Sequence, residues 1–117
     1  MKIRSAVLTA IFLVFFTAVL LADGFIDING LQVPLPQGAV KTQKQSRQEG
    51  VRLAAYSVNK PLDEVVNFYS SFLSDNGFLL IGGEGAGGFN ASVKKGAAMF
   101  TLRISKEKSA TLVEFIW

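Results

Sequence analysis

Apolar and polar residues alternate along the last third of the chain, which is the pattern of half-buried β-strands. The pattern fills residues 89–95, 98–104 and 111–117, and the turns between them fall at Gly96 and in the polar run 106–109. We predict three antiparallel strands with these inward side chains: Phe89, Ala91, Val93, Phe100, Leu102, Ile104, Val113, Phe115 and Trp117.

A different spacing in residues 61–76 predicts an amphipathic helix. Its apolar positions recur every three or four residues and comprise Leu62, Val65, Val66, Tyr69, Phe72 and Leu73. Pro61 is suited to the first turn, where no backbone N–H is needed. The helix ends at Asn76-Gly77, since glycine readily adopts the left-handed conformation of a C-terminal cap.

Shorter elements are expected on both sides of this helix. Residues 25–33 resemble a first strand with a turn at Asn29-Gly30, and Pro34 and Pro36 then bar a regular central strand. Residues 40–48 predict an exposed edge strand or hairpin arm that pairs with 51–58. Residues 78–81 form a wholly apolar strand and 82–88 a glycine-rich loop. The fold class is therefore α+β, with one helix on a mostly antiparallel sheet of five to six strands.

The first 24 residues have the three-part layout of a secretory signal. Lys2 and Arg4 precede an uncharged run at 5–22, and Asp23-Gly24 ends it. Cleavage would fall before Phe25 or after residue 22. The run is also nearly long enough to span a bilayer, so an uncleaved membrane anchor is the alternative. We expect an exported chain in the periplasm or secreted, or anchored in the inner membrane and facing the periplasm, with a single domain at 25–117.

Composition narrows the chemistry of this domain. The 117 residues carry a net charge of +3, and removing Lys2, Arg4 and Asp23 with the leader reduces it, which argues against nucleic-acid binding. The chain has no cysteine and no histidine, so it lacks a lipidation site, the commonest general base and the commonest metal ligand. We predict no cofactor, no metal and no enzymatic activity.

One motif invites a nucleotide-binding interpretation. Gly83-x-Gly85-x-x-Gly88 matches the phosphate-binding pattern G-x-G-x-x-G. That motif requires a helix directly after it, whereas an alternating strand follows here, so we interpret the glycines as a hairpin loop.

Two groups of residues are candidates for an interaction surface. Lys41, Lys44, Arg47 and Arg52 form a basic stretch that could bind an acidic partner or anionic lipid, or could simply protect an exposed edge strand from aggregation. Leu112 and Ile116 point away from the predicted core, which suggests a second layer, self-association or a protein partner.

Two resemblances accompany these patterns. The L-P-x-G-A stretch at 35–39 and the F-Y-x-x-x-L-x-x-x-G-F pattern at 68–78 resemble uncharacterised small exported bacterial α+β proteins, which implies export and fold but no chemistry. The helix is also similar to that of a single glyoxalase/bleomycin-resistance module, whose metal-binding histidine has no counterpart here. We expect a non-enzymatic protein-interaction or structural module of the bacterial envelope; the alternatives are a metal-free, ligand-binding homodimer of glyoxalase-like type and a membrane-anchored accessory subunit.

Overall fold

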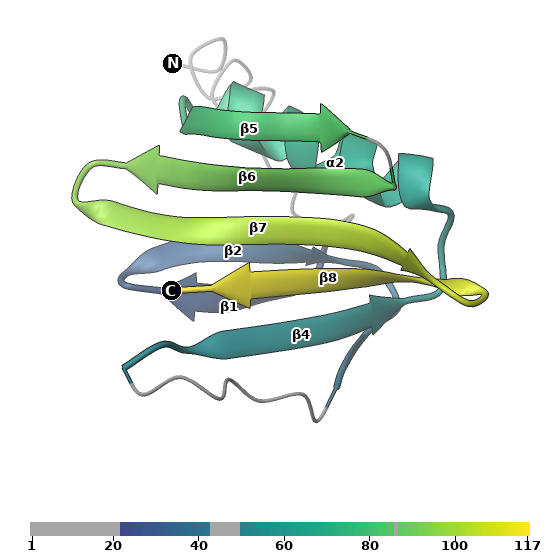
Figure 1. Ribbon diagram of the computed structural model, residues 1–117. Helices are drawn as coiled ribbons and strands as arrows, with labels where there is room; N and C mark the ends of the chain where they lie inside the picture. Colours follow the sequence, from purple (N-terminus) through teal and green to yellow (C-terminus); the bar gives the residue numbers. More distant parts are fainter. Residues whose placement is uncertain (1–21, 43–49, 86) are drawn as a thin grey trace, which may run out of the picture.

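The computed structural model describes residues 22–42, 50–85 and 87–117, which form two layers (Figure 1). The elements are, in chain order, β1 (Ala22–Ile28), β2 (Leu31–Pro36), β3 (Ala39–Lys41), β4 (Leu53–Val58), α2 (Leu62–Asp75), β5 (Leu79–Gly85), β6 (Gly88–Lys95), β7 (Ala98–Glu107) and β8 (Ala110–Ile116). One layer is a six-stranded antiparallel sheet in the order β3-β4-β8-β7-β6-β5. The other consists of α2 and the β1–β2 hairpin, which lie on the same face of that sheet.

This architecture confirms the predicted α+β class, with one helix packed on an antiparallel sheet of six strands. Strand β1 begins at Ala22, inside the segment expected to be the leader, and residues 1–21 lie outside the described residues. Across the described ranges, we find no helix with the length and apolar character needed to span a membrane.

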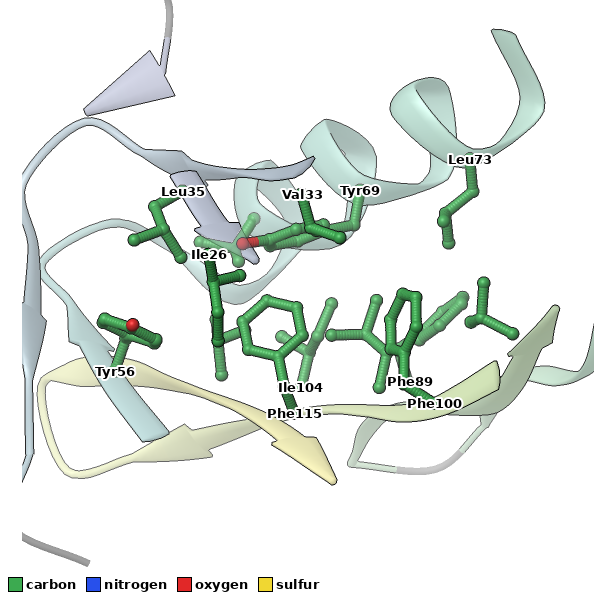
Figure 2. Packing of buried hydrophobic residues seen from close by; sticks show 14 of the residues in the cluster. Ile26, Val33, Leu35, Tyr56, Tyr69, Leu73, Phe89, Phe100, Ile104 and Phe115 are labelled. Carbon is green, nitrogen blue, oxygen red and sulfur yellow. The ribbon is translucent and has the colours of Figure 1, made fainter. Parts of the chain in front are cut away.

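The core fills the space between the two layers, and Phe115 of β8 lies at its centre (Figure 2). The predicted inward positions within β6, β7 and β8 are all buried, and Trp117, which directly follows β8, is partly buried. The ring of Phe115 lies 5.9 Å from that of Tyr69, 6.0 Å from that of Phe100 and 6.2 Å from that of Tyr56, measured between centroids. Aromatic rings in edge-to-face or tilted contact stabilise this small core, which has no disulfide.

The β1–β2 hairpin covers the part of the sheet that α2 leaves open. Its turn is the expected Asn29-Gly30, where both residues have positive φ and the Gly30 N–H donates to Asp27 Oδ1 at 2.9 Å. Pro34 and Pro36 lie within β2, which is not a central strand, in agreement with the expectation that these prolines bar one. Among the described residues β2 pairs only with β1, so a proline can be placed where no ladder hydrogen bond is lost.

A buried hydrogen bond fastens the hairpin to the helix. The hydroxyl of Tyr69 in α2 donates to the backbone carbonyl of Pro34 at 2.9 Å. In Figure 2 this hydroxyl points from the helix toward the hairpin. The bond satisfies two polar groups that have no access to water.

One segment prediction is wrong. The glycine-rich segment 82–88 is not a loop, because β5 continues to Gly85 and β6 begins at Gly88. Gly82 and Gly88 have φ of +109° and +146°, and a Cβ on Gly82 would lie 2.5 Å from the backbone oxygen of Asn90. Glycine is needed here because the neighbouring backbone approaches closely. Of the predicted edge strand at 40–48, the structure places residues 40 and 41 in the edge strand β3, and residues 43–49 lie outside the described residues.

Candidate functional site

The six-stranded sheet has two edges, and they differ in length and character. Strand β3 forms one edge with three residues and ends in Lys41. Strand β5 forms the other with seven residues, and among the strands that the structure describes it pairs only with β6 (Figure 1). A strand with one unpaired side presents a row of backbone N–H and C=O groups that another strand can bind. We call residues 79–85 the β5 edge.

Three consecutive aliphatic side chains stand exposed on the β5 edge. Leu79, Leu80 and Ile81 expose 61%, 38% and 71% of their surface. Leu80 lies opposite the buried Val93 and therefore faces the helix side of the sheet, whereas its two neighbours face the outer side. Helix α2 packs mainly on β6, β7 and β8, which explains why Leu80 is not covered.

The β5 edge has few of the features that protect edge strands from pairing. It contains no lysine, arginine or proline, and its pairing with β6 runs over seven residue pairs without a register shift. Proteins usually shield an exposed edge with lysine, proline, a bulge or a very short strand. Strand β3 uses two of these devices, whereas the one charged side chain of β5 is the exposed Glu84 near its C-terminal end.

The outer face of the sheet continues from this edge. Ile81 is aligned through β6 and β7 with Ile116 of β8, and Leu112 lies on the same face. Both β8 side chains are half-buried, while Met99 of β7 exposes 58% of its surface. The structure therefore places Leu112 and Ile116 on the face opposite the core, as the sequence suggested.

Charge on this outer face is partly neutralised. Glu114 is buried, and its Oε1 lies 4.0 Å from Nη1 of the half-exposed Arg103. The two residues are also direct cross-strand neighbours between β7 and β8. Opposite charges at such a position stabilise the register of the sheet by a small amount.

Two residues of the basic stretch lie at the opposite edge of the sheet from β5. Lys41 is exposed at the end of β3, and Arg52 is exposed just before β4. Arg52 also exchanges two backbone hydrogen bonds with Trp117, at 2.7 and 3.0 Å, so its backbone has a structural role. Lys44 and Arg47 lie outside the described residues, so the structure brings together no complete basic patch.

A small hollow lies where the β5–β6 turn meets β7. Its volume is about 170 Å³, and it is lined by Gly83, Gly85, Gly87, Gly88, Phe89, Asn90, Arg103, Ile104 and Ser105. Pockets for small ligands usually enclose roughly 300–1,000 Å³, so this hollow is small for such a role. The G-x-G-x-x-G glycines run into strand β6 and not into a helix, so they lack the helix N-terminus that binds a pyrophosphate.

Titratable groups do not converge on a reactive centre in the described part of the chain. No three His, Cys, Asp or Glu residues among these ranges are placed to hold a metal ion. Burial raises the pKa of Tyr69 well above its usual value, and the nearby Tyr56 adds to this effect. Both rings belong to the core, where the neutral phenol is favoured.

Comparison of the chain with protein-family models, curated proteins and solved structures found no match. The resemblances to small exported bacterial proteins and to glyoxalase-type modules therefore stay predictions.

The sequence alone did not single out the β5 edge. The run Phe78-Leu79-Leu80-Ile81 has no alternation, which is typical of a strand buried on both faces. A domain with one helix can cover only one face of its sheet, however, so a wholly apolar strand must leave some side chains in solvent. That inconsistency was the signal that could have identified the edge.

Proposed function

We propose that this chain is a non-enzymatic protein-interaction domain of the bacterial envelope, and that it binds a strand of another polypeptide along the β5 edge. The observation that carries this proposal is the weakly protected edge itself. It is a seven-residue strand that pairs on one side with β6, has no partner on its other side among the described residues, and carries the exposed Leu79, Leu80 and Ile81. Strand addition to a sheet edge is a common mode of protein recognition, in which the backbone supplies affinity and alternate side chains supply specificity.

The composition of the chain favours binding over catalysis. It has no histidine or cysteine to act as base, nucleophile or metal ligand at neutral pH. Its carboxylates at Asp63 and Glu64 lie in the first turn of α2, where negative charge is favoured by the helix dipole. An interaction domain needs none of these groups to react.

A photo-crosslinking experiment in cells tests the binding function. The photoreactive residue benzoylphenylalanine is placed at position 81, in the β5 edge, or at position 40, in the β3 edge. Ile81 and Val40 are both highly exposed, at 71% and 65%, so Val40 is a matched control. We expect a crosslinked protein adduct from position 81 and little from position 40. Absence of any protein adduct at position 81, or equal adducts at both positions, would refute the proposed function.

Export of the domain rests on the sequence of residues 1–24. The intact mass of the chain in fractionated cells tests it. A mass that starts near residue 23 or 25 in the soluble envelope fraction corresponds to a cleaved leader, whereas the full-length mass in the membrane fraction corresponds to an anchored accessory subunit. Full-length chain in the cytoplasmic fraction would contradict export.

A further inference from the structure

We propose that the strand bound by the β5 edge is β5 of a second copy of this chain. The two strands would pair antiparallel about a twofold axis at Leu80 and join two six-stranded sheets into one. This inference rests on the function proposed above and names its partner. Its basis is that the exposed side chains of β5 complement themselves.

The register follows from the order of the exposed residues. In an antiparallel pair centred on Leu80, this residue lies opposite Leu80 of the second copy, and Leu79 lies opposite Ile81 of that copy. Leu79 and Ile81 share the outer face of the sheet, while Leu80 faces the helix side. Each exposed aliphatic side chain therefore meets an aliphatic side chain on the same face, which is the arrangement that stabilises cross-strand pairs.

Charge disfavours the register that would maximise strand length. A pair centred on Gly82 would align all of residues 79–85, but it would place Glu84 opposite Leu80 and Ile81 opposite Gly83. Glu84 is the only charged residue of β5, and it is exposed. Placing a carboxylate between apolar side chains costs free energy without compensation. In the Leu80 register, Glu84 lies beyond the paired residues and remains in water.

The described residues around β5 leave room for a second copy. Helix α2 packs mainly on the three strands β6, β7 and β8, and Leu80 is still 38% exposed on the helix side. The partner strand can therefore approach in the plane of the sheet. Identical chains most often associate about a twofold axis, which requires a surface that complements itself. The triplet of residues 79–81 meets that requirement, whereas an unrelated strand would have to carry matching aliphatic residues on both faces.

A cysteine crosslinking experiment tests this pairing in the full chain. The chain contains no cysteine, so one introduced thiol can be followed without background. Leu80→Cys would lie opposite itself across the axis, at the separation of about 4.5–5.5 Å between Cα atoms that paired antiparallel residues have. This separation is suitable for a disulfide. Cells producing the variant are treated with diamide, a membrane-permeant oxidant, and the chain is analysed by non-reducing electrophoresis.

Val40→Cys is the matched control, because Val40 is 65% exposed on the β3 edge. We expect about tenfold more disulfide-linked homodimer from Leu80→Cys, since only that thiol is placed in the geometry a disulfide needs. A second test examines the register. Leu79→Cys and Ile81→Cys produced in the same cells should crosslink with each other more than either does alone, because their opposite partners are each other.

Each outcome has a definite meaning. A homodimer band for Leu80→Cys with little for Val40→Cys supports the pairing, and so does preferential crosslinking of the mixed pair. Equal dimer from Leu80→Cys and Val40→Cys indicates random collision and overturns it. If position 81 yields photo-adducts only with other proteins while Leu80→Cys and the mixed pair give no homodimer, the inference fails and the binding function survives. If no adduct of any kind forms, both fail.

Discussion

The substitution Tyr69→Phe should measure how much the hydrogen bond between α2 and the β1–β2 hairpin stabilises the domain. In Tyr69→Phe the ring remains, and so do its contacts with Phe68 and Phe115, at 5.0 and 5.9 Å between centroids. Only the hydroxyl that donates to Pro34 is lost. The side chain is fully buried, so water cannot replace the missing donor.

The expected loss follows from leaving the Pro34 carbonyl without a partner. An unsatisfied buried polar group costs about 1–3 kcal/mol. For a domain of this size, each kilocalorie shifts the midpoint of thermal unfolding by about 4–8 °C, so we expect a decrease of roughly 5–20 °C. Hydrogen exchange of the β1–β2 amides should accelerate more than that of β7, because the bond fixes the hairpin.

Urea unfolding followed by circular dichroism gives the free energy, and Tyr56→Phe is the matched control. Tyr56 is also a core residue, but among the described residues no hydrogen bond joins its hydroxyl to another group. We expect its removal to change the free energy of unfolding by no more than about 0.5 kcal/mol. If Tyr69→Phe destabilises the chain no more than Tyr56→Phe, the hydrogen bond does not fasten the hairpin and the reasoning is wrong.

Three further predictions concern the sheet, its connection to the helix, and pH. Gly88→Ala should destabilise the domain by at least about 2–4 kcal/mol in urea titrations, because its Cβ would collide with a backbone carbonyl of β7 at a strongly positive φ. A Cβ added at Gly85 meets no atom within 4 Å, so Gly85→Ala should change the free energy of unfolding by about 0.5 kcal/mol or less. If Gly85→Ala and Gly88→Ala destabilise the domain equally, the steric argument is wrong. Thr111→Val should lower the free energy of unfolding by about 1–2 kcal/mol, since the Thr111 hydroxyl donates to the Lys60 carbonyl at 2.7 Å, and an unchanged melting temperature would oppose this. Burial raises the pKa of the Tyr69 phenol, so its contribution to the free energy of unfolding is intact below the ordinary pKa of 10.0 and is lost as the pH rises beyond it. In Tyr69→Phe the free energy of unfolding should therefore fall less between pH 9 and 11 than in the unsubstituted chain. An identical dependence of stability on pH in both chains would refute this reasoning.

Local patterns determined most of the fold. The alternation in β6, β7 and β8 identified the buried side of each strand, and the spacing of Val65, Tyr69 and Leu73 identified the packed side of α2. These predictions succeed because side-chain direction along a strand or helix is fixed by the periodicity of the backbone. The turn at Asn29-Gly30 could also be predicted from its own two residues, since both tolerate positive φ.

Features that depend on contacts between distant segments could not be predicted in this way. Among the described residues β2 pairs only with β1, so Pro34 can lie within it, and residues 82–85 extend β5 because Gly82 allows the β6 backbone to approach. Neither pairing is visible in the residues themselves. The sequence indicated a glycine-rich loop where the sheet in fact continues.

At the candidate site, too, local patterns predicted some features and long-range contacts decided the others. The sequence by itself determined that Leu79, Leu80 and Ile81 form an apolar strand, and that Leu112 and Ile116 point away from the core. Only the tertiary structure decided that β5 is an edge strand, because strand order depends on which long-range pairings form. Side-chain periodicity is a property of one segment, whereas exposure is set by what the rest of the chain places beside it.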